Sequence, residues 1–324
     1  MRHPSLPLQG ESSGALATDA GIRPLLRTFS YHYRCKFGHG VGKIPLDLHY
    51  PCPNRRHGGC IFCRPAGFTP EYLRHRIGLA EQLAAGKIRH LKGRFKKYFA
   101  YFQQETCTAM PSGEFLPLLR GVVAEDDCIG LILSTRPDHV ADDFLHPLSE
   151  LIVSSGKECL FELGVQSVHE KSLRLLNRNH DFAAFQDGAS RILAFGCFEL
   201  GAHLLFGIPG ESEEEMLESL KTVCAMGVKH LKLHQLQVMR DTPLASLHAR
   251  GKVKLFSLEG YLQFLLRALP IIPAAVTLHR LWATAHPEFL LAPRWNRPAS
   301  ELSLLLQGRM AEAGVFQGQA VVGG

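Results

Sequence analysis

The chain has 324 residues, of which 46% are apolar and 20% are charged. This composition can bury a large core and excludes a disordered or fibrous protein. The formal net charge of +6 suits an anionic small molecule or a nucleic acid as a partner, but it is too mild to select either one.

Residues 1–28 are expected to form a flexible lead-in to the folded part of the chain. The segment is interrupted by Gly, Ser and Pro and lacks the continuous apolar run of a signal peptide. No later stretch approaches the roughly 20 unbroken apolar residues that span a bilayer. We therefore expect a cytoplasmic protein without a membrane partner. Its nine cysteines should be reduced thiols, packed in the core or bound to metal, rather than disulfides.

Between residues 29 and 240, short apolar runs alternate with longer amphipathic ones, which is an α/β pattern. Strands are expected at residues 43–50, 97–103, 128–135, 159–167, 198–210 and 228–238, and helices are expected to start near Thr69, Ser112, Asp138, Phe182 and Ser212. Ser212 is the clearest start, because its hydroxyl can cap a helix whose first turn carries three glutamates. Repeated strand–helix–strand units predict a parallel sheet, and six units fall short of the eight in a complete barrel. The region from 29 to 240 is therefore predicted to form a partial (β/α)6 TIM-like barrel.

Residues 241–324 are predicted to form a C-terminal extension, because the alternating pattern changes there. Residues 241–253 are typical of a loop, 257–269 of a helix and 274–282 of a strand. The closing segment, 316–324, carries no charge and ends in paired glycines, so we expect it to be frayed.

Three cysteines, Cys52, Cys60 and Cys63, lie in the segment "CPNRRHGGCIFC" directly after the first predicted strand. Catalytic groups of parallel α/β folds gather at this end of the strands, and Gly58 and Gly59 allow the backbone to turn closely there. Three interpretations compete. The thiols could be unrelated core residues, or they could bind structural zinc together with a fourth ligand from elsewhere. They could also bind an iron–sulfur cluster, and three thiolates would leave one iron open for chemistry.

The motifs around and after this loop resemble those of the radical SAM superfamily, and in particular an uncharacterised bacterial group related to the elongator catalytic subunit. The similar motifs, in chain order, are "KIPLD", "CPNRRHGGCIFC", "YFQ", "ELGVQS", "NRNHD" and "GIPGE". The resemblance covers residues 33–297. It implies that Cys52, Cys60 and Cys63 hold a 4Fe-4S cluster whose open iron binds S-adenosylmethionine (SAM). Two features depart from the family pattern: seven residues rather than three separate the first two cysteines, and Cys107 stands where relatives tend to carry Asn.

The same resemblance implies where SAM would bind. Its methionine portion would lie at the end of the second strand, against Gln103 and against Thr106 or Thr108. Its adenine or ribose would contact the turn that contains Gly207 and Gly210, where glycine permits a close backbone approach.

Two further SAM contacts are predicted from residue chemistry near the fourth strand. Glu162 and Gln166 have the same parity on that strand and hence one face, where a carboxylate and an amide can bind ribose hydroxyls or the SAM ammonium. Arg178 follows the strand and can bind a carboxylate through two hydrogen bonds. Isolated histidines and cysteines on apolar runs are interpreted as core residues, namely His203, His230, His234, Cys35, Cys128, Cys159, Cys197 and Cys224.

The resemblance implies an enzyme in which an external electron donor reduces the cluster and SAM is cleaved to a 5′-deoxyadenosyl radical. The substrate is not evident from the sequence. A basic segment from Arg74 to Lys97 makes RNA one candidate, and a small metabolite is the other. The alternative from another class is a zinc-stabilised binding protein without catalysis.

Overall fold

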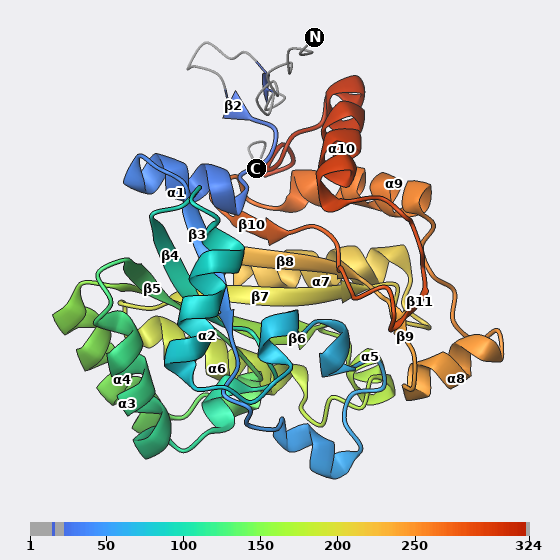
Figure 1. Ribbon diagram of the computed structural model, residues 1–324. Coiled ribbons are helices and arrows are strands. Elements are labelled where there is room, and N and C mark those ends of the chain that lie inside the picture. The colour runs from blue at the N-terminus through green and yellow to red at the C-terminus, as the bar shows by residue number, and fades with distance from the viewer. Residues whose placement is uncertain (1–14, 17–22, 322–324) are drawn as a thin grey trace, which may run out of the picture.

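The computed structural model, which describes residues 15–16 and 23–321, contains a curled parallel sheet of seven strands with helices on its outside (Figure 1). The predicted lead-in lies mostly outside the described residues. In spatial order the strands are β10 (Thr277–Arg280), β8 (His230–Gln235), β7 (Glu199–Phe206), β6 (Glu158–Gln166), β5 (Cys128–Thr135), β4 (Lys97–Phe102) and β3 (Val41–Leu46). Every neighbouring pair is parallel. The sheet curls without closing, which confirms the predicted partial barrel.

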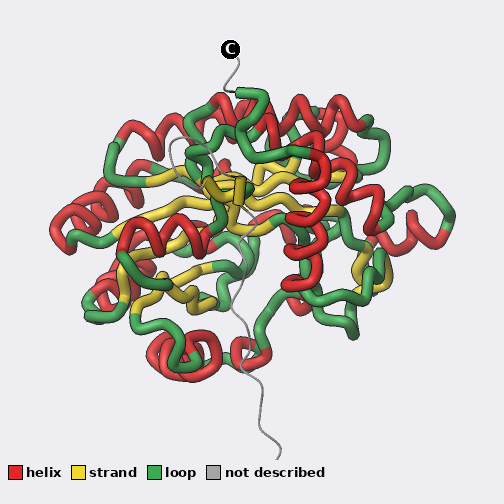
Figure 2. The backbone as a smooth tube through the Cα atoms, turned by 90° about the horizontal axis from the view of Figure 1, so that it is seen from above, coloured by secondary structure: helices red, strands yellow, loops and turns green. Residues whose placement is uncertain are grey.

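Helices lie around the outside of the curled sheet, as the view from above in Figure 2 shows. They are α1 (Phe29–Phe37), α2 (Leu79–Gly86), α3 (Ser112–Val123), α4 (Asp142–Ser155), α5 (Glu170–Leu175), α6 (Phe182–Ala194), α7 (Glu213–Ala225), α8 (Pro243–Ala249), α9 (Leu258–Ala268) and α10 (Ala299–Ala313). Short antiparallel pairs join β1 (Ala15–Leu16) to β2 (Arg23–Pro24) and β9 (Val238–Met239) to β11 (Leu290–Ala292). No helix in the described part of the chain has the length and apolarity needed to cross a membrane.

The two faces of the sheet carry different residues, because side chains alternate along each strand. Outward residues such as Phe102, Leu131 and Leu133 are fully buried and join the large core beneath the helices. The inward face begins with an apolar layer that includes Phe99 and Ile132. Farther along the strands, the inward face becomes polar and forms the site described below.

Helix α1 packs against the apolar layer at the amino-terminal end of the strands. Phe29 and Tyr33 lie on one side of this helix, and their rings contact Phe99 with centroid separations of 6.1 and 4.8 Å. Its start is fixed by Thr28, whose hydroxyl accepts a hydrogen bond from the Tyr31 N–H. The barrel interior is thus filled with apolar groups at this end, and its polar groups face the opposite end.

Several predicted elements agree with the structure. The third strand matches at both ends, and Ser212 and Glu215 form a reciprocal capping box at the start of α7, with bonds of 3.2 and 2.8 Å. The first and fifth strands end earlier than predicted, at Leu46 and Phe206.

Other predictions were wrong. The predicted loop at 241–253 contains α8, because Thr242 caps the helix and Pro243 takes its first position, where a missing N–H costs nothing. The helix expected near Thr69 begins only at Leu79, since the intervening residues form tight turns. Helices α1, α5 and α10 were not predicted from the sequence.

The C-terminal extension contributes directly to the sheet. Its strand β10 pairs with β8 and becomes the seventh strand. The expectation of a frayed end was wrong for the described residues, because Gln317 is buried and its amide donates to the carbonyls of Pro273 and Val276 at 3.0 and 2.7 Å. Residues 322–324 lie outside the described part of the chain.

Candidate active site

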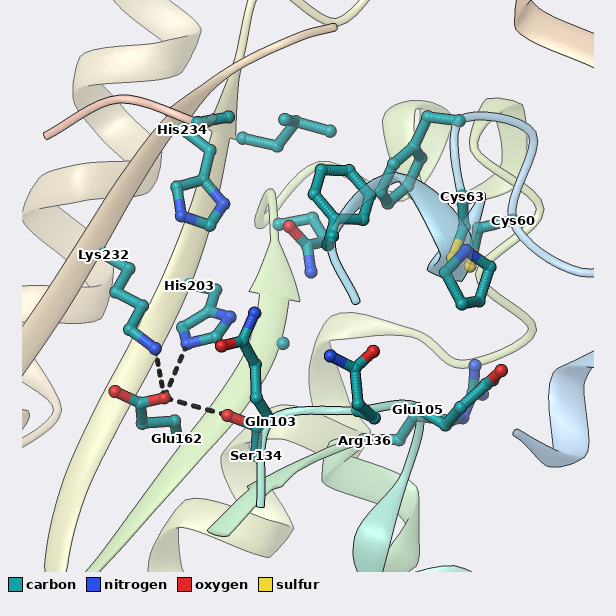
Figure 3. Close-up of a pocket in the computed structure, with 18 of the residues that line it drawn as sticks. Cys60, Cys63, Gln103, Glu105, Ser134, Arg136, Glu162, His203, Lys232 and His234 are labelled. Carbon is teal, nitrogen blue, oxygen red and sulfur yellow. Dashed lines mark hydrogen bonds and ion pairs between the residues drawn. The ribbon is translucent and has the colours of Figure 1, made fainter. Parts of the chain in front are cut away.

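The cysteine segment forms a tight loop at the carboxyl end of β3. A single 3₁₀ turn, Pro53–His57, follows Cys52, and Gly58 and Gly59 then adopt positive φ angles of 84° and 73° that favour glycine. A second turn joins the Cys63 N–H to the Cys60 carbonyl at 3.0 Å. All three cysteines line one cavity of about 240 Å³, and Figure 3 shows the sulfurs of Cys60 and Cys63 side by side.

Three asparagines attach this loop to a segment that follows β6. Asn54 donates to the Asn177 carbonyl at 2.7 Å, and Asn177 donates to the Gly59 carbonyl at 2.7 Å. Asn179 donates to the Asn54 side-chain oxygen at 2.6 Å. Two segments separated by more than 100 positions in the sequence thereby hold each other in place, and the cysteines have a fixed backbone beneath them.

Hydrogen-bond donors are directed at two of the three sulfurs. Asn54 Nδ2 and Arg178 Nη1 each lie 3.3 Å from Cys60 Sγ, and the Thr106 hydroxyl lies 3.2 Å from Cys52 Sγ. Donors of this kind stabilise thiolates and tune a metal centre that the thiolates hold. These contacts fit an iron–sulfur cluster in which the cysteines are ionised.

In the chain without metal, the Cys63 thiol is harder to ionise than an ordinary cysteine. This residue is exposed, yet burial of its thiol and then the adjacent Cys60 raise the pKa of Cys63 to about 12. Metal binding must therefore displace a proton from this thiol. Among the described residues, no three His, Cys, Asp or Glu side chains are arranged to hold a single metal ion, so the zinc interpretation gains no support.

Four non-glycine residues of the cavity wall and of the asparagine contacts have a left-handed backbone conformation. Glu105, Gln166, Asn177 and Asn179 all have positive φ angles, of 56°, 70°, 52° and 51°. Residues other than glycine rarely adopt positive φ angles, and they are found there mainly where the surrounding structure enforces a functional geometry. Glu105 uses its position to accept hydrogen bonds from the Cys52 N–H and the Arg55 guanidinium.

A buried charge network lies on the side of the cavity opposite the cysteines (Figure 3). Glu162 is at its centre and is only 2% exposed. One of its oxygens accepts hydrogen bonds from Ser134 at 2.8 Å, from His203 at 3.2 Å and from Lys232; the other accepts from His279 at 3.0 Å. Strands β5, β7, β8 and β10 thus each direct one donor at this carboxylate.

Protonation in this network follows from burial and charge. Burial would raise the pKa of Glu162, but Lys232 and the hydrogen bonds from His203 and His279 outweigh it and hold this pKa well below its ordinary value. Burial lowers the pKa of Lys232 to about 8, against the opposing effect of Glu162. Burial and then Lys232 lower the pKa of His203 to about 4. At neutral pH, an ionised Glu162 therefore faces a charged lysine and a neutral histidine.

Comparison with known proteins assigns the fold and the site to one family. The model of the Radical SAM superfamily matches residues 50–223, which include the cysteine loop, and that of the Radical SAM C-terminal domain matches residues 228–312. The chain belongs to the radical SAM superfamily. Radical SAM enzymes use a 4Fe-4S cluster and SAM, so this chain is an enzyme with those cofactors.

The most similar relatives include proteins of nearly the same length. The chain is 34% identical over 298 residues to the uncharacterized protein YtqA of Bacillus subtilis, covering 90% of this chain and 91% of that one. It is 34% identical over 278 residues to the protein YhcC of Escherichia coli, covering 85% and 88%. The solved structure of Methanocaldococcus infernus Elp3 covers 86% of this chain and 64% of its own, with a TM-score of 0.65 and 18% identity, and supports the shared fold.

The radical SAM site brings together most of the residues predicted to contact SAM. Gln103, Thr106, Glu162, Gln166 and Arg178 line the same cavity as the three cysteines.

The other three predicted contacts lie elsewhere. The Thr108 hydroxyl is bonded to Thr135 and to the His139 carbonyl rather than facing the cavity. Gly207 and Gly210 line a separate pocket beside residues 252–256. Their contact with SAM stays a prediction.

Several residues of the inner face were not predicted from the sequence. His203 and His234 were interpreted as ordinary core residues, yet both line the cavity, as do Lys232 and Arg136. Alternation was the available signal, because His230, Lys232 and His234 occupy every second position of one strand and therefore share a face. Cys35 was also misinterpreted, since it is exposed rather than packed; Cys128 and Cys159 are buried as predicted.

His203 predicts a specific acid sensitivity. Its pKa is about 4 in the folded chain and 6.5 when unperturbed, so the unfolded state binds more protons between these values. Stability from this residue is therefore present above pH 6.5 and is lost as the pH falls toward 4. Between pH 6.5 and pH 4, we expect the free energy of unfolding to fall by roughly 3 kcal/mol less in His203→Gln than in the unsubstituted chain.

Denaturant unfolding at several pH values between 4 and 7 measures this difference. Exposed His39, replaced in the same way, is the matched control and should leave the pH profile unchanged. If the free energy of unfolding changed with pH in the same way for His203→Gln and the unsubstituted chain, burial would not be holding His203 in its neutral form.

Proposed function

We propose that Cys52, Cys60 and Cys63 hold the 4Fe-4S cluster and that the chain uses it to cleave SAM and remove a hydrogen atom from a substrate carbon. The supporting observation is the joint placement of three thiols on one cavity wall, with hydrogen-bond donors directed at the sulfurs of Cys52 and Cys60. When bound, the cluster and SAM supply a 5′-deoxyadenosyl radical through one-electron reduction by an external donor.

The residues of this chain would position the reactants. Arg178 and Asn54 orient Cys60 through hydrogen bonds, and the Thr106 hydroxyl does the same for Cys52. Gln103 and Gln166 are available to bind SAM beside the cysteines. Enclosure by the strands would exclude water from the radical. Glu162, predicted above as a SAM contact, lies across the cavity from the cysteines and has both oxygens hydrogen-bonded, so we assign the polar layer around it to the substrate instead.

Anaerobic reconstitution tests this proposal. The chain is loaded with iron and sulfide, reduced with dithionite and given SAM, and 5′-deoxyadenosine and methionine are quantified. Equal amounts of both products are expected. A colourless protein that contains zinc, holds no sulfide and forms neither product would instead support the zinc-stabilised binding protein.

Two further observations favour RNA as the substrate class. The exposed residues Arg76, Lys92 and Lys96 of the basic segment have no ion pair within the described part of the chain. In addition, a relative from Methanocaldococcus infernus named tRNA uridine(34) acetyltransferase is 26% identical over 163 residues, which cover 49% of this chain and 29% of that protein. Binding of bulk tRNA that weakens steeply with salt would support RNA over a small metabolite.

A further inference from the structure

The inner end of the cavity has more positive than negative charge. Arg280 and Lys232 line it, and register pairing places these two residues opposite each other on β10 and β8. Glu162 is the carboxylate that faces them. Farther along the cavity, Arg136 is paired with Asp138 and Glu105 with Arg55, so neither carboxylate is available to balance the inner end.

Glu162 makes its hydrogen bonds to groups other than Arg280. Its two oxygens already accept hydrogen bonds from Lys232, His203, Ser134 and His279. Among the residues that the structure describes, the Arg280 side chain has no hydrogen-bond or ion-pair partner, although the residue is partly buried. A guanidinium without a protein acceptor keeps its five donors available for an anion that enters the cavity.

His234 supplies a second unsatisfied group at the same place. Burial, and then the charge of Arg280, hold the pKa of His234 well below its ordinary value, so the ring is neutral. Its Nε2 atom is buried and lacks a hydrogen-bond partner. Figure 3 shows the ring beside Lys232 and His203, across the cavity from Cys60 and Cys63. A neutral imidazole can present an N–H to an acceptor that enters the cavity.

We propose that Arg280, Lys232 and His234 form a subsite for an anionic group of the substrate, a carboxylate or a phosphate. An oxyanion there would accept hydrogen bonds from the guanidinium and the imidazole and would balance the excess positive charge. Because the subsite lies across the cavity from the cysteines, the anchored substrate would extend toward the position of SAM. The inference rests on the proposed function and adds the charge of the substrate to it.

Anion binding by the cluster-loaded full-length chain, without SAM or reductant, tests this subsite. Inorganic phosphate and acetate are titrated separately in chloride-free buffer at constant ionic strength, and the rise in melting temperature gives the affinity. We expect saturable binding that weakens at least about tenfold in Arg280→Gln, since charge-assisted bonds are lost. Tighter binding of phosphate would indicate a phosphorylated substrate, and tighter binding of acetate a carboxylate.

Two variants serve as controls. Arg120→Gln removes an equal charge from the exposed surface of α3 and should bind as the unsubstituted chain does. Arg280→Lys keeps the charge without the planar fork and should bind with intermediate affinity, which separates anion recognition from misfolding.

Three outcomes would overturn the subsite: no saturable binding of either anion, equal weakening in Arg280→Gln and Arg120→Gln, or displacement of the anion by SAM, which would assign the site to the SAM carboxylate. The test is independent of SAM cleavage. A chain that binds the anion but forms no 5′-deoxyadenosine refutes the proposed function alone, and one that forms 5′-deoxyadenosine but binds no anion refutes the subsite alone.

Discussion

Replacing Cys60 with alanine is expected to abolish cluster assembly and to reduce 5′-deoxyadenosine formation by at least roughly 100-fold. Cys60 is the most buried of the three loop cysteines and receives hydrogen bonds from both Asn54 and Arg178. Its loss leaves two thiols, too few to hold three irons of a cluster, and removes the acceptor for a buried guanidinium. Iron and sulfide per chain, the visible absorption of the cluster and 5′-deoxyadenosine all measure the effect.

Cys35→Ala is the matched control for this experiment. Cys35 is exposed on α1, at the end of the barrel opposite the cysteine loop. Its replacement removes one thiol without changing the cavity. It should keep the full cluster content and the full yield of 5′-deoxyadenosine. If Cys60→Ala kept them as well, the assignment of the cluster to this loop would be wrong.

Much of the fold follows from local sequence, because its signals lie within single elements. The strand Cys128–Thr135 is a continuous apolar run of the kind that is buried on both faces of a parallel sheet, and Ser212 with Glu215 marks a helix start. Helix α8 was missed because its start, Thr242–Pro243, also fits a turn. The closeness of β10 to β8 could not be predicted, since it is a contact between distant segments.

The site, like the fold, has one part that can be predicted from local sequence and one part that depends on contacts between distant segments. The cysteine loop is local, and its spacing and glycines predict a metal site from twelve consecutive residues. Arg280 and the charge network around Glu162 depend on which strands become neighbours in the curled sheet, and no single stretch of sequence contains that information. The asparagine contacts between Asn54 and Asn177 are likewise visible only after folding.

The buried polar layer has a physical cost that suggests why it is present. An apolar layer at this depth would be at least as stable as an ion pair removed from water. The strands nevertheless place Glu162, Lys232 and Arg280 between the apolar layer beside α1 and the cysteine loop. A charged layer facing a cavity is expected where a polar ligand must be bound and oriented.

Glu162→Gln is expected to lower the free energy of unfolding by about 3–5 kcal/mol, because it leaves Lys232 buried without its counter-charge. Lys232 is only 3% exposed, so water cannot replace the carboxylate. The loss should be largest below pH 8, where Lys232 is charged in the folded chain, and smaller above it, because the pKa of this lysine is about 8. Denaturant unfolding at pH 6.5 and pH 9 measures both values.

Two further variants show whether the cost arises from the buried pair itself. Glu162→Gln combined with Lys232→Met removes both charges and should recover most of the lost stability, because no buried lysine is then left without its counter-charge. Glu301→Gln breaks an exposed pair with Arg297, in which both side chains are 50% exposed, and should cost less than about 1 kcal/mol. A Glu162→Gln cost no larger than that of Glu301→Gln, or a double variant no more stable than the single one, would show that Glu162 and Lys232 do not depend on each other. The recovery expected in the double variant would place the cost in the unpaired charge rather than in altered packing, and it would leave Arg280 as the cation available to a substrate anion.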